Sequence, residues 1–494
     1  MFDNIKRLGT ETAVYGISTI VGRFLNFLLV PFYTNILPPS EYGIVSYAFS
    51  LIAFMNVVYG YGMESAYFRY SATLEIGSKE QNFNTPFISL FLTSTLLSSL
   101  LALMAPTVST LVALPPHQEI IVTYASWILL FDTLSVIPFA YLRMQHKAGL
   151  FASLKSFNIV LNVGANLILL LVYDMGIEGI FLSNLIASAS TFLLLVPIIQ
   201  KQFSGEFSTD LYRSLLKFGL PYVPAGIAAM MIQVVDRPIL RLLTDDATVG
   251  IYQANYRLGI FMMLIVQMYD YAWRPFFLSH AQDANAKQMF ARILTYFVLF
   301  MSIVFLVLTL FLPDIVRLSV FGRHLIHPDY WGALGIVPIV LLGYLFLGVS
   351  NNFVAGIYIQ KKTHFLPPIT FVGAAVNVGA NFLLIPHLGA YGAAWATLLS
   401  YLAMATVLYF MVQRVYPVEY EWGRLVKIMA SCGIVTALYY AIPFDGTIWK
   451  AVLVVVFCAS MSLMKFFDKE EIGIVKKLWE RGTNNLPPNA TPSA

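Results

Sequence analysis

The sequence contains fourteen apolar runs of about 20 residues, separated by short polar or turn-forming segments. A run of this length crosses a hydrocarbon core about 30 Å thick as an α-helix, which satisfies its own backbone hydrogen bonds. We therefore expect an all-α polytopic membrane protein with about fourteen transmembrane helices. The runs cover approximately residues 12–33, 43–63, 86–106, 119–141, 153–173, 178–200, 215–236, 249–271, 292–312, 332–358, 365–386, 390–412, 426–442 and 447–465.

The composition excludes a soluble globular protein. Of the 494 residues, 58% are hydrophobic and 11% are charged, whereas soluble domains carry roughly 25% charged residues. The net charge of +4 is small and dispersed, which argues against a nucleic-acid partner. The two cysteines, Cys432 and Cys458, lie inside apolar runs, so the sequence predicts neither a disulfide framework nor a metal site.

The distribution of Lys and Arg predicts the orientation in the membrane. With the N-terminus inside, 23 of the 30 cations fall in inner segments and 5 in outer segments. Short cytoplasmic loops retain positive charge, so we expect both termini in the cytoplasm. The two remaining cations, Arg23 and Arg257, fall inside apolar runs.

A repeat divides the chain into similar halves. The pentapeptide Asn-Val-Gly-Ala-Asn occurs at 162–166 and at 377–381, an offset of 215, and Gly43 and Gly250 lie in a weaker match at an offset of 207. We expect six-helix bundles over 1–203 and 204–417, transmembrane helices 13 and 14 within 418–467, and a cytoplasmic tail over 468–494.

An even number of spans in each repeat gives both copies the same orientation. The two bundles should then be parallel repeats, related by an axis along the membrane normal, as in transporters that alternate access by rocking. Within the repeated pentapeptide, Gly and Asn are typical of close helix packing and interhelical hydrogen bonding. We interpret these residues as packing positions rather than substrate ligands.

Several motifs resemble those of the polysaccharide transporter family, the Wzx-type oligosaccharide flippases, within the multidrug/oligosaccharidyl-lipid/polysaccharide exporter superfamily. The resemblance covers essentially the whole chain through the order and spacing of its motifs. These are Leu37-Pro-Pro-Ser-Glu-Tyr-Gly43, Phe218-Gly-Leu-Pro221, Pro224, Asp236-Arg237-x-x-Leu240, Gly250-Ile-Tyr252-x-x-x-Tyr256-Arg257, Asn377 to Asn381, Ile385-Pro386 and Gly389-x-x-Gly392.

The resemblance implies a function and a location. Members move an undecaprenyl-diphosphate-linked oligosaccharide across the bacterial inner membrane, and a polysaccharide polymerase and a chain-length regulator are the implied protein partners. The sequence contains no P-loop and no nucleophile–base constellation, so we expect a non-enzymatic transporter without a bound cofactor. Coupling to a proton or a sodium gradient is left open.

Four residues are candidate substrate ligands. Arg23 lies eleven residues into its span, roughly 16 Å deep at ~1.5 Å per residue. An arginine at that depth is costly unless it faces a wet or protein-lined interior, where its guanidinium group can bind a diphosphate bidentately. The structural alternative is an ion pair with Asp132 or Asp270. The other candidates are Arg257, whose alternative is snorkelling to the interface, and Tyr252 and Tyr256 as sugar-stacking residues.

Four further residues are candidates for gating. Asp236 and Arg237 end the seventh span, where they form either a cavity rim or a local ion pair. Pro221 and Pro224 lie near the start of the same span and remove backbone hydrogen bonds, which permits a bend between two states.

Three other functions remain open at this stage. A peptidoglycan lipid-precursor flippase has the same substrate chemistry, and a cation-coupled multidrug exporter belongs to the same superfamily. A membrane polysaccharide polymerase is a third alternative, although that class would be expected to have a large external loop, which the sequence lacks.

Overall fold

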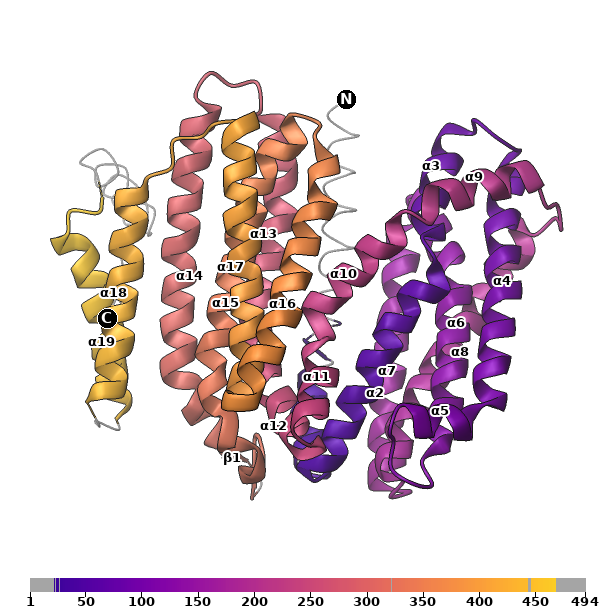
Figure 1. Cartoon of the computed structure of the whole chain (residues 1–494), viewed down its shortest axis with the longest axis horizontal. Helices are drawn as coiled ribbons and strands as arrows, with labels where there is room; N and C mark the ends of the chain where they lie inside the picture. The colour runs from indigo at the N-terminus through magenta and orange to yellow at the C-terminus, as the bar shows by residue number, and fades with distance from the viewer. Residues whose placement is uncertain (1–21, 23, 26, 321, 443–445, 468–494) are drawn as a thin grey trace, which may run out of the picture. The chain divides into compact units, whose positions relative to one another are not determined.

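The computed structural model describes residues 22, 24, 25, 27–320, 322–442 and 446–467. This part of the chain is helical except for one two-residue antiparallel strand pair and the connecting loops (Figure 1). Residues 27–34 are helical. The helices that follow in the first half are α2 (Pro39–Gly60), α3 (Met63–Thr73), α4 (Lys79–Leu103), α5 (Ala105–Leu111), α6 (Glu119–Met144), α7 (Ala148–Leu171) and α8 (Gly176–Gln202).

The second half begins with a series of short helices. Its elements are α9 (Thr209–Gly219), α10 (Tyr222–Val234), α11 (Asp236–Leu243), α12 (Asp246–Tyr256), η1 (Arg257–Gly259), α13 (Ile260–Ser279), α14 (Ala286–Arg317), β1 (Ser319–Val320), β2 (Arg323–His324), η2 (Pro328–Ile336), α15 (Val337–Ile359), η3 (Thr363–Phe365), α16 (Leu366–Leu388) and α17 (Ala390–Val415). Two helices close the described chain, α18 (Trp422–Ala441) and α19 (Thr447–Leu463).

The membrane-spanning fold is confirmed, but the count of fourteen helices is not. Eleven described helices are long and apolar enough to cross a membrane, or twelve if α9 and α10 form one span bent by 41°. The last predicted span corresponds to α19, whose 17 residues are apolar but shorter than a full span. Most of the first predicted span, 12–33, lies outside the described residues.

The chain divides into two compact units. The first contains the described residues up to Ala281 together with Ile315–Pro417, and the second contains Gln282–Asp314 together with the described residues from Val418. Helix α14, which we expected in the second bundle, is thus grouped with α18 and α19. This grouping does not test whether residues 1–203 and 204–417 superpose as six-helix bundles. The two bundles therefore stay a prediction.

Within the second unit, charged side chains connect α14 to the C-terminal helix pair. Lys450 of α19 donates hydrogen bonds of 2.7 and 2.6 Å to the two carboxylate oxygens of Asp314, and the Lys450 side chain is only 4% exposed. Glu421 pairs with Arg292 at 3.4 Å and with Arg424 at 3.7 Å.

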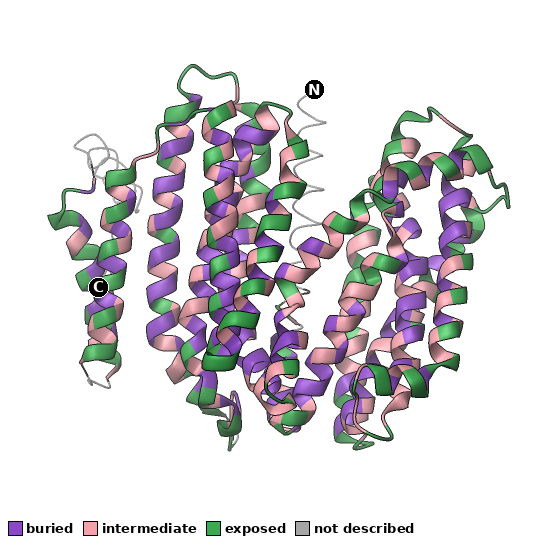
Figure 2. Ribbon diagram, viewed as in Figure 1, coloured by how far each residue is buried: buried purple, intermediate pink, exposed green. Residues whose placement is uncertain are grey.

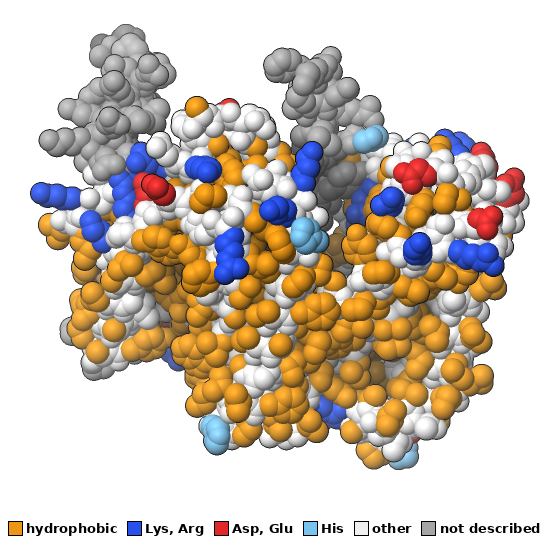
Figure 3. Space-filling view, turned by 45° about the horizontal axis from the view of Figure 1, so that its top comes forward, with side chains coloured by type: hydrophobic (Ala, Val, Ile, Leu, Met, Phe, Trp, Pro, Cys, Tyr) orange, Lys and Arg blue, Asp and Glu red, His pale blue; other side chains and the backbone are white. Residues whose placement is uncertain are grey.

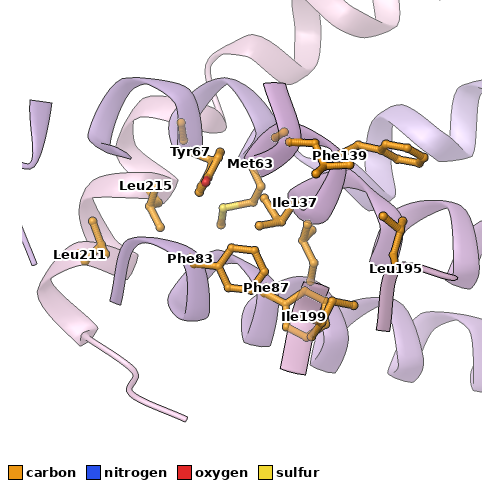
Figure 4. Packing of buried hydrophobic residues seen from close by; sticks show 14 of the residues in the cluster. Met63, Tyr67, Phe83, Phe87, Ile137, Phe139, Leu195, Ile199, Leu211 and Leu215 are labelled. Atoms are coloured by element: carbon orange, nitrogen blue, oxygen red, sulfur yellow. The ribbon is translucent and has the colours of Figure 1, made fainter. Parts of the chain in front are cut away.

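A hydrophobic core holds the first-half helices together. Met63, Phe83, Ile137 and Leu195, from α3, α4, α6 and α8, pack in one cluster (Figure 4). The cluster also includes Leu211 and Leu215 of α9 (Figure 4). Helix α9 therefore packs on the first half, although it belongs to the second half in sequence.

Helix α10 packs on the other half. Ala228 and Ile232 of α10 form a buried cluster with Ala374 of α16 and Tyr401 of α17. Buried residues lie where helices face one another, and exposed residues lie on the outward helix faces (Figure 2). The short link between α9 and α10 is the point at which the chain passes from one core to the other.

Two glycines allow α2 and α12 to cross in backbone contact. A Cβ atom on Gly43 would lie 1.8 Å from the carbonyl oxygen of Asp246, and one on Gly250 would lie 1.9 Å from that of Pro39. Gly43 corresponds to Gly250, and Pro39 to Asp246, at the same offset of 207. The contact is therefore reciprocal, as expected where a local two-fold axis relates two copies of a repeat.

We predict that Gly43→Ala and Gly250→Ala each destabilise the protein by about 1–3 kcal/mol, because overpacking at a close contact forces the backbones apart. Thermal unfolding of the detergent-solubilised variants measures the effect. Gly164→Ala is the matched control, since a Cβ atom on this helical glycine meets no heavy atom within 4 Å. Equal melting temperatures for all three variants would contradict the prediction.

Candidate functional site

The first unit contains a cavity of about 780 Å³ between elements of its two halves. Tyr33, Ser46 and Asn162 line it from the first half, and Gln253 and Tyr401 line it from the second. Two of the described lining residues are cationic, Arg237 and Arg257, and none is Asp, Glu, Lys or His. The lining therefore presents positive charge together with neutral polar groups.

Arg257 contributes a cation that has no carboxylate partner in the part of the chain that the structure describes. It begins the single 3-10 turn η1 between α12 and α13 and lines the cavity in a half-buried position. No carboxylate of the described residues lies within 4.0 Å of its guanidinium group, so no protein anion offsets this charge at close range. Tyr33 and Tyr42 line the same cavity.

Arg237, in contrast, is held by several protein groups. Its Nη1 lies 2.6 Å from Asp236 Oδ1 and donates a 2.5 Å hydrogen bond to the Gln233 carbonyl oxygen. Its Nε donates to Gln253 Oε1 at 3.0 Å. Its Nη2 has no hydrogen-bond partner among the described residues. These contacts fix the Arg237 guanidinium group. Its Nη2 remains available, and the Arg237 side chain lines the cavity.

The two predicted sugar-stacking tyrosines occupy different positions. Tyr256 lines the cavity, and its ring centre lies 4.6 Å from the Arg237 guanidinium carbon, a cation–π contact. Tyr252 is fully buried and is not among the residues lining the cavity. Its hydroxyl group donates a hydrogen bond to Asp236 Oδ2, so Tyr252 stabilises the ion pair between Asp236 and Arg237.

The cavity walls on α2 and α12 use equivalent positions of the repeat. Ser46, Phe49 and Ser50 of α2 line the cavity, and so do Gln253, Tyr256 and Arg257. Each of the first three precedes its counterpart by 207 residues. The two copies of the repeat thus contribute equivalent helix faces to the cavity wall. Of these six residues, only Arg257, in the second copy, is cationic.

Polar contacts join the two halves near the start of α2 and α12. Asn35 donates to the His324 carbonyl oxygen at 2.9 Å, and the Tyr330 hydroxyl group donates to that of Leu37 at 2.8 Å. Arg241 donates to the Val112 carbonyl oxygen at 3.1 Å and pairs with Asp246 at 2.5 Å. These contacts lie at the side of the first unit that the charge distribution predicts to be outer.

The remaining predicted site residues lie elsewhere. Arg23 falls outside the described residues. Its proposed partners have other contacts, since Asp132 accepts a 2.7 Å hydrogen bond from Ser188 and Asp270 pairs with Arg274 at 2.9 Å. Pro221 immediately precedes α10, and Pro224 lies in its first turn.

The cavity wall also contains amide side chains that were not predicted as site residues, and two of them, Asn162 and Asn166, belong to the pentapeptide that we interpreted as packing positions. Besides Gln253, these are Asn162, Asn166, Asn184, Gln233 and Gln267. A polar amide inside an apolar span was the available signal, because such groups need a partner or a wet surface in the membrane. Among the described residues, no group of three or more His, Cys, Asp or Glu side chains could hold a metal ion.

Comparison with known proteins identifies the family. Residues 8–282, more than half of the chain, match a family described as polysaccharide biosynthesis protein. The chain belongs to this family. It is 21% identical over 423 residues to the Lsg locus putative protein 1 of Haemophilus influenzae, covering 82% of this chain and 98% of the relative.

Solved structures share the fold of this family member. A structure of the lipid II flippase MurJ in an inward closed conformation matches 92% of this chain and 97% of its own, with a TM-score of 0.73 and 16% identity. An inward-facing multidrug resistance MATE transporter of the MOP superfamily matches 79% and 94%, with a TM-score of 0.65 and 13% identity. The family resemblance and the polytopic transporter fold are both confirmed.

We predict that Asp236→Asn destabilises the protein by about 3–5 kcal/mol, because it leaves the buried Arg237 cation without its counter-charge. Adding Arg237→Gln to this variant should recover much of the loss. Thermal unfolding in detergent measures both effects. Asp270→Asn is the control, since its partner Arg274 has a 58% exposed side chain and such pairs contribute about 0–1 kcal/mol. Equal losses in the two single variants would show that Asp236 has no special structural role.

Proposed function

We propose that this protein is a flippase that moves an undecaprenyl-diphosphate-linked oligosaccharide across the bacterial inner membrane by alternating access. The position of Arg257 carries this proposal, because this residue presents to the cavity a cation that pairs with no carboxylate of the described residues, and the described lining contains no Asp or Glu. A buried cation in a membrane protein is costly unless an anion or water offsets its charge. A diphosphate provides two acceptor groups for Arg257 and for the free Nη2 of Arg237.

The size and polarity of the cavity support a glycan beside the diphosphate. Its volume of about 780 Å³ lies within the roughly 300–1,000 Å³ usual for ligand pockets. Amides and tyrosines of the wall offer hydrogen bonds to hydroxyl groups without adding charge. The family description, polysaccharide biosynthesis protein, agrees with a sugar-bearing substrate.

The connection between α9 and α10 supports a rocking movement. Helix α9 packs on the core of the first half and α10 on that of the second, with a 41° bend between them. Pro221 lies in this link, and Pro224 follows in the first turn of α10. We propose that the two prolines form a hinge, while the contacts of Asn35, Tyr330 and Arg241 open and close the outer side.

Two alternatives share parts of this chemistry. A peptidoglycan-precursor flippase also carries a lipid diphosphate, and a solved structure with this fold is titled a lipid II flippase. A multidrug exporter of organic cations is disfavoured, since both charged side chains described in the lining are cationic. The family membership favours a substrate of polysaccharide synthesis over both.

We predict that Arg257→Gln lowers transport at least tenfold while the amount of folded protein stays near normal, because Arg257 belongs to no ion pair among the described residues. Transport by Arg257→Lys should lie between that of the wild type and that of Arg257→Gln, since an ammonium group keeps the charge and loses the bidentate fork. Surface polysaccharide in cells, normalised to membrane-inserted protein, measures transport.

Arg274→Gln is the control, because it removes one cation of α13 that does not line the cavity. Full transport by a well-expressed Arg257→Gln variant would overturn the anionic site. Rescue of a strain lacking its peptidoglycan-precursor flippase, without restored polysaccharide, would favour that alternative. Arg23 remains a proposed ligand, and Arg23→Ala can be measured in the same assay.

We further propose that both termini lie in the cytoplasm. On the face shown in Figure 3, Lys and Arg side chains gather toward one end of the helices, and hydrophobic side chains cover the wall below them. Cytoplasmic loops carry this excess of positive charge. The polymerase and chain-length regulator of the same pathway would act on the opposite side of the membrane.

We predict that alkaline phosphatase fused after Arg481 is inactive, because the fusion would remain in the cytoplasm. Fusion to a fluorescent protein that folds only in the cytoplasm should be fluorescent at the same site. A second fusion in the predicted outer loop, after His327, is the control and should show phosphatase activity. An active phosphatase after Arg481 would overturn the topology.

A further inference from the structure

An amide row runs along the first-half wall of the cavity. Asn162 and Asn166 of α7 line it together with Asn184 of α8. Tyr33 donates a 2.8 Å hydrogen bond to Asn166 Oδ1, and Asn166 Nδ2 donates to Asn162 Oδ1 at 3.2 Å. Asn166 thus uses both ends of its amide within the protein and fixes the orientation of Asn162.

Two amides of this row keep free hydrogen-bonding groups. Asn162 Nδ2 has no partner among the described residues, and neither has the side chain of Asn184. Both side chains are half-buried and belong to the wall. Polar groups in such a place are satisfied by water or by a ligand.

The second copy of the repeat provides an internal comparison. Asn381 Nδ2 donates to the Asn377 carbonyl oxygen at 2.9 Å and to Asn377 Oδ1 at 3.0 Å, as Asn166 does to Asn162 at 2.9 and 3.2 Å. Asn377 and Asn381 are 1% and 0% exposed and are not among the lining residues. Packing explains the hydrogen bonds common to both copies, but it does not explain why only the first copy lines the cavity.

We infer that Asn162 and Asn184 bind the first neutral sugar of the substrate, with Asn166 and Tyr33 as positioning residues. This inference rests on the proposed function. An amide offers a donor and an acceptor side by side, which matches vicinal hydroxyl groups or an acetamido group. A sugar carrying a free ammonium group is disfavoured, because the described lining contains two guanidinium groups and no carboxylate.

The position of the row fits a sugar attached directly to the diphosphate. Arg257 and Tyr33 line the same cavity, and Tyr33 is hydrogen-bonded to Asn166. The amides therefore face the same cavity as the cation that we assign to the diphosphate. A lipid-linked glycan bound at Arg257 would place its first sugar against Asn162 and Asn184.

Binding of defined lipids to the purified full-length protein tests the inference. The probes are undecaprenyl diphosphate and the same lipid carrying N-acetylglucosamine or galactose. For the wild type we expect at least one of the two sugars to tighten binding about tenfold, the gain from a few neutral hydrogen bonds. In Asn162→Leu and Asn184→Leu this gain should shrink to twofold or less, while undecaprenyl diphosphate binds as before.

Asn377→Leu is the matched control, and its sugar gain should equal that of the wild type. An unchanged gain in both Asn162→Leu and Asn184→Leu, or no gain in the wild type, would overturn the sugar subsite and leave the diphosphate site standing. If undecaprenyl diphosphate itself fails to bind, or binds equally to Arg257→Gln, the proposed function fails instead.

Discussion

The backbone contact between Gly43 and Gly250 is the constraint on which the arrangement of the first unit depends. Lipid offers no hydrophobic force to hold transmembrane helices together, so close packing over small residues replaces it. Any side chain at either position would meet a carbonyl oxygen at less than 2 Å. Asp245 caps α12 through a 2.7 Å hydrogen bond from the Thr248 amide, and Pro39 begins α2, so the first residue of each helix, Asp246 or Pro39, takes part in the contact.

The cavity is a consequence of that crossing. The residues one and two turns after each glycine, Ser46 and Ser50 on α2 and Gln253 and Arg257 after Gly250, line the cavity. Equivalent positions have diverged in chemistry, with serine in the first copy and glutamine or arginine in the second. A repeat that fixes the geometry thus leaves the polarity of each wall free to change.

The sequence indicates how deep in the membrane a residue lies better than it indicates which face of its helix the residue occupies. Arg257 could be predicted as a site residue because a charge inside an apolar run requires a special environment. Tyr252 could not be distinguished from Tyr256, since both lipid and protein interior are apolar and the hydrophobic pattern does not show which face meets the cavity. For the same reason, the sequence could not distinguish Asn162, which lines the cavity, from its buried counterpart Asn377. Only the tertiary arrangement separates the two.

The polar contacts between the two halves are suited to a reversible movement. Asn35 and Tyr330 donate to backbone carbonyl oxygens across the two halves, and neutral hydrogen bonds of this kind each contribute about 0.5–1.5 kcal/mol. Arg241 adds a charged donor to the Val112 carbonyl oxygen, for which roughly 1.5–3 kcal/mol is usual. Such a set holds the two halves together at this side by several kcal/mol, a difference that a ligand can reverse if it binds a separated state more tightly by a similar amount. We propose that a diphosphate bound at Arg257 supplies that preference, because Arg257 begins the turn η1 directly after α12, the helix whose Asp246 pairs with Arg241.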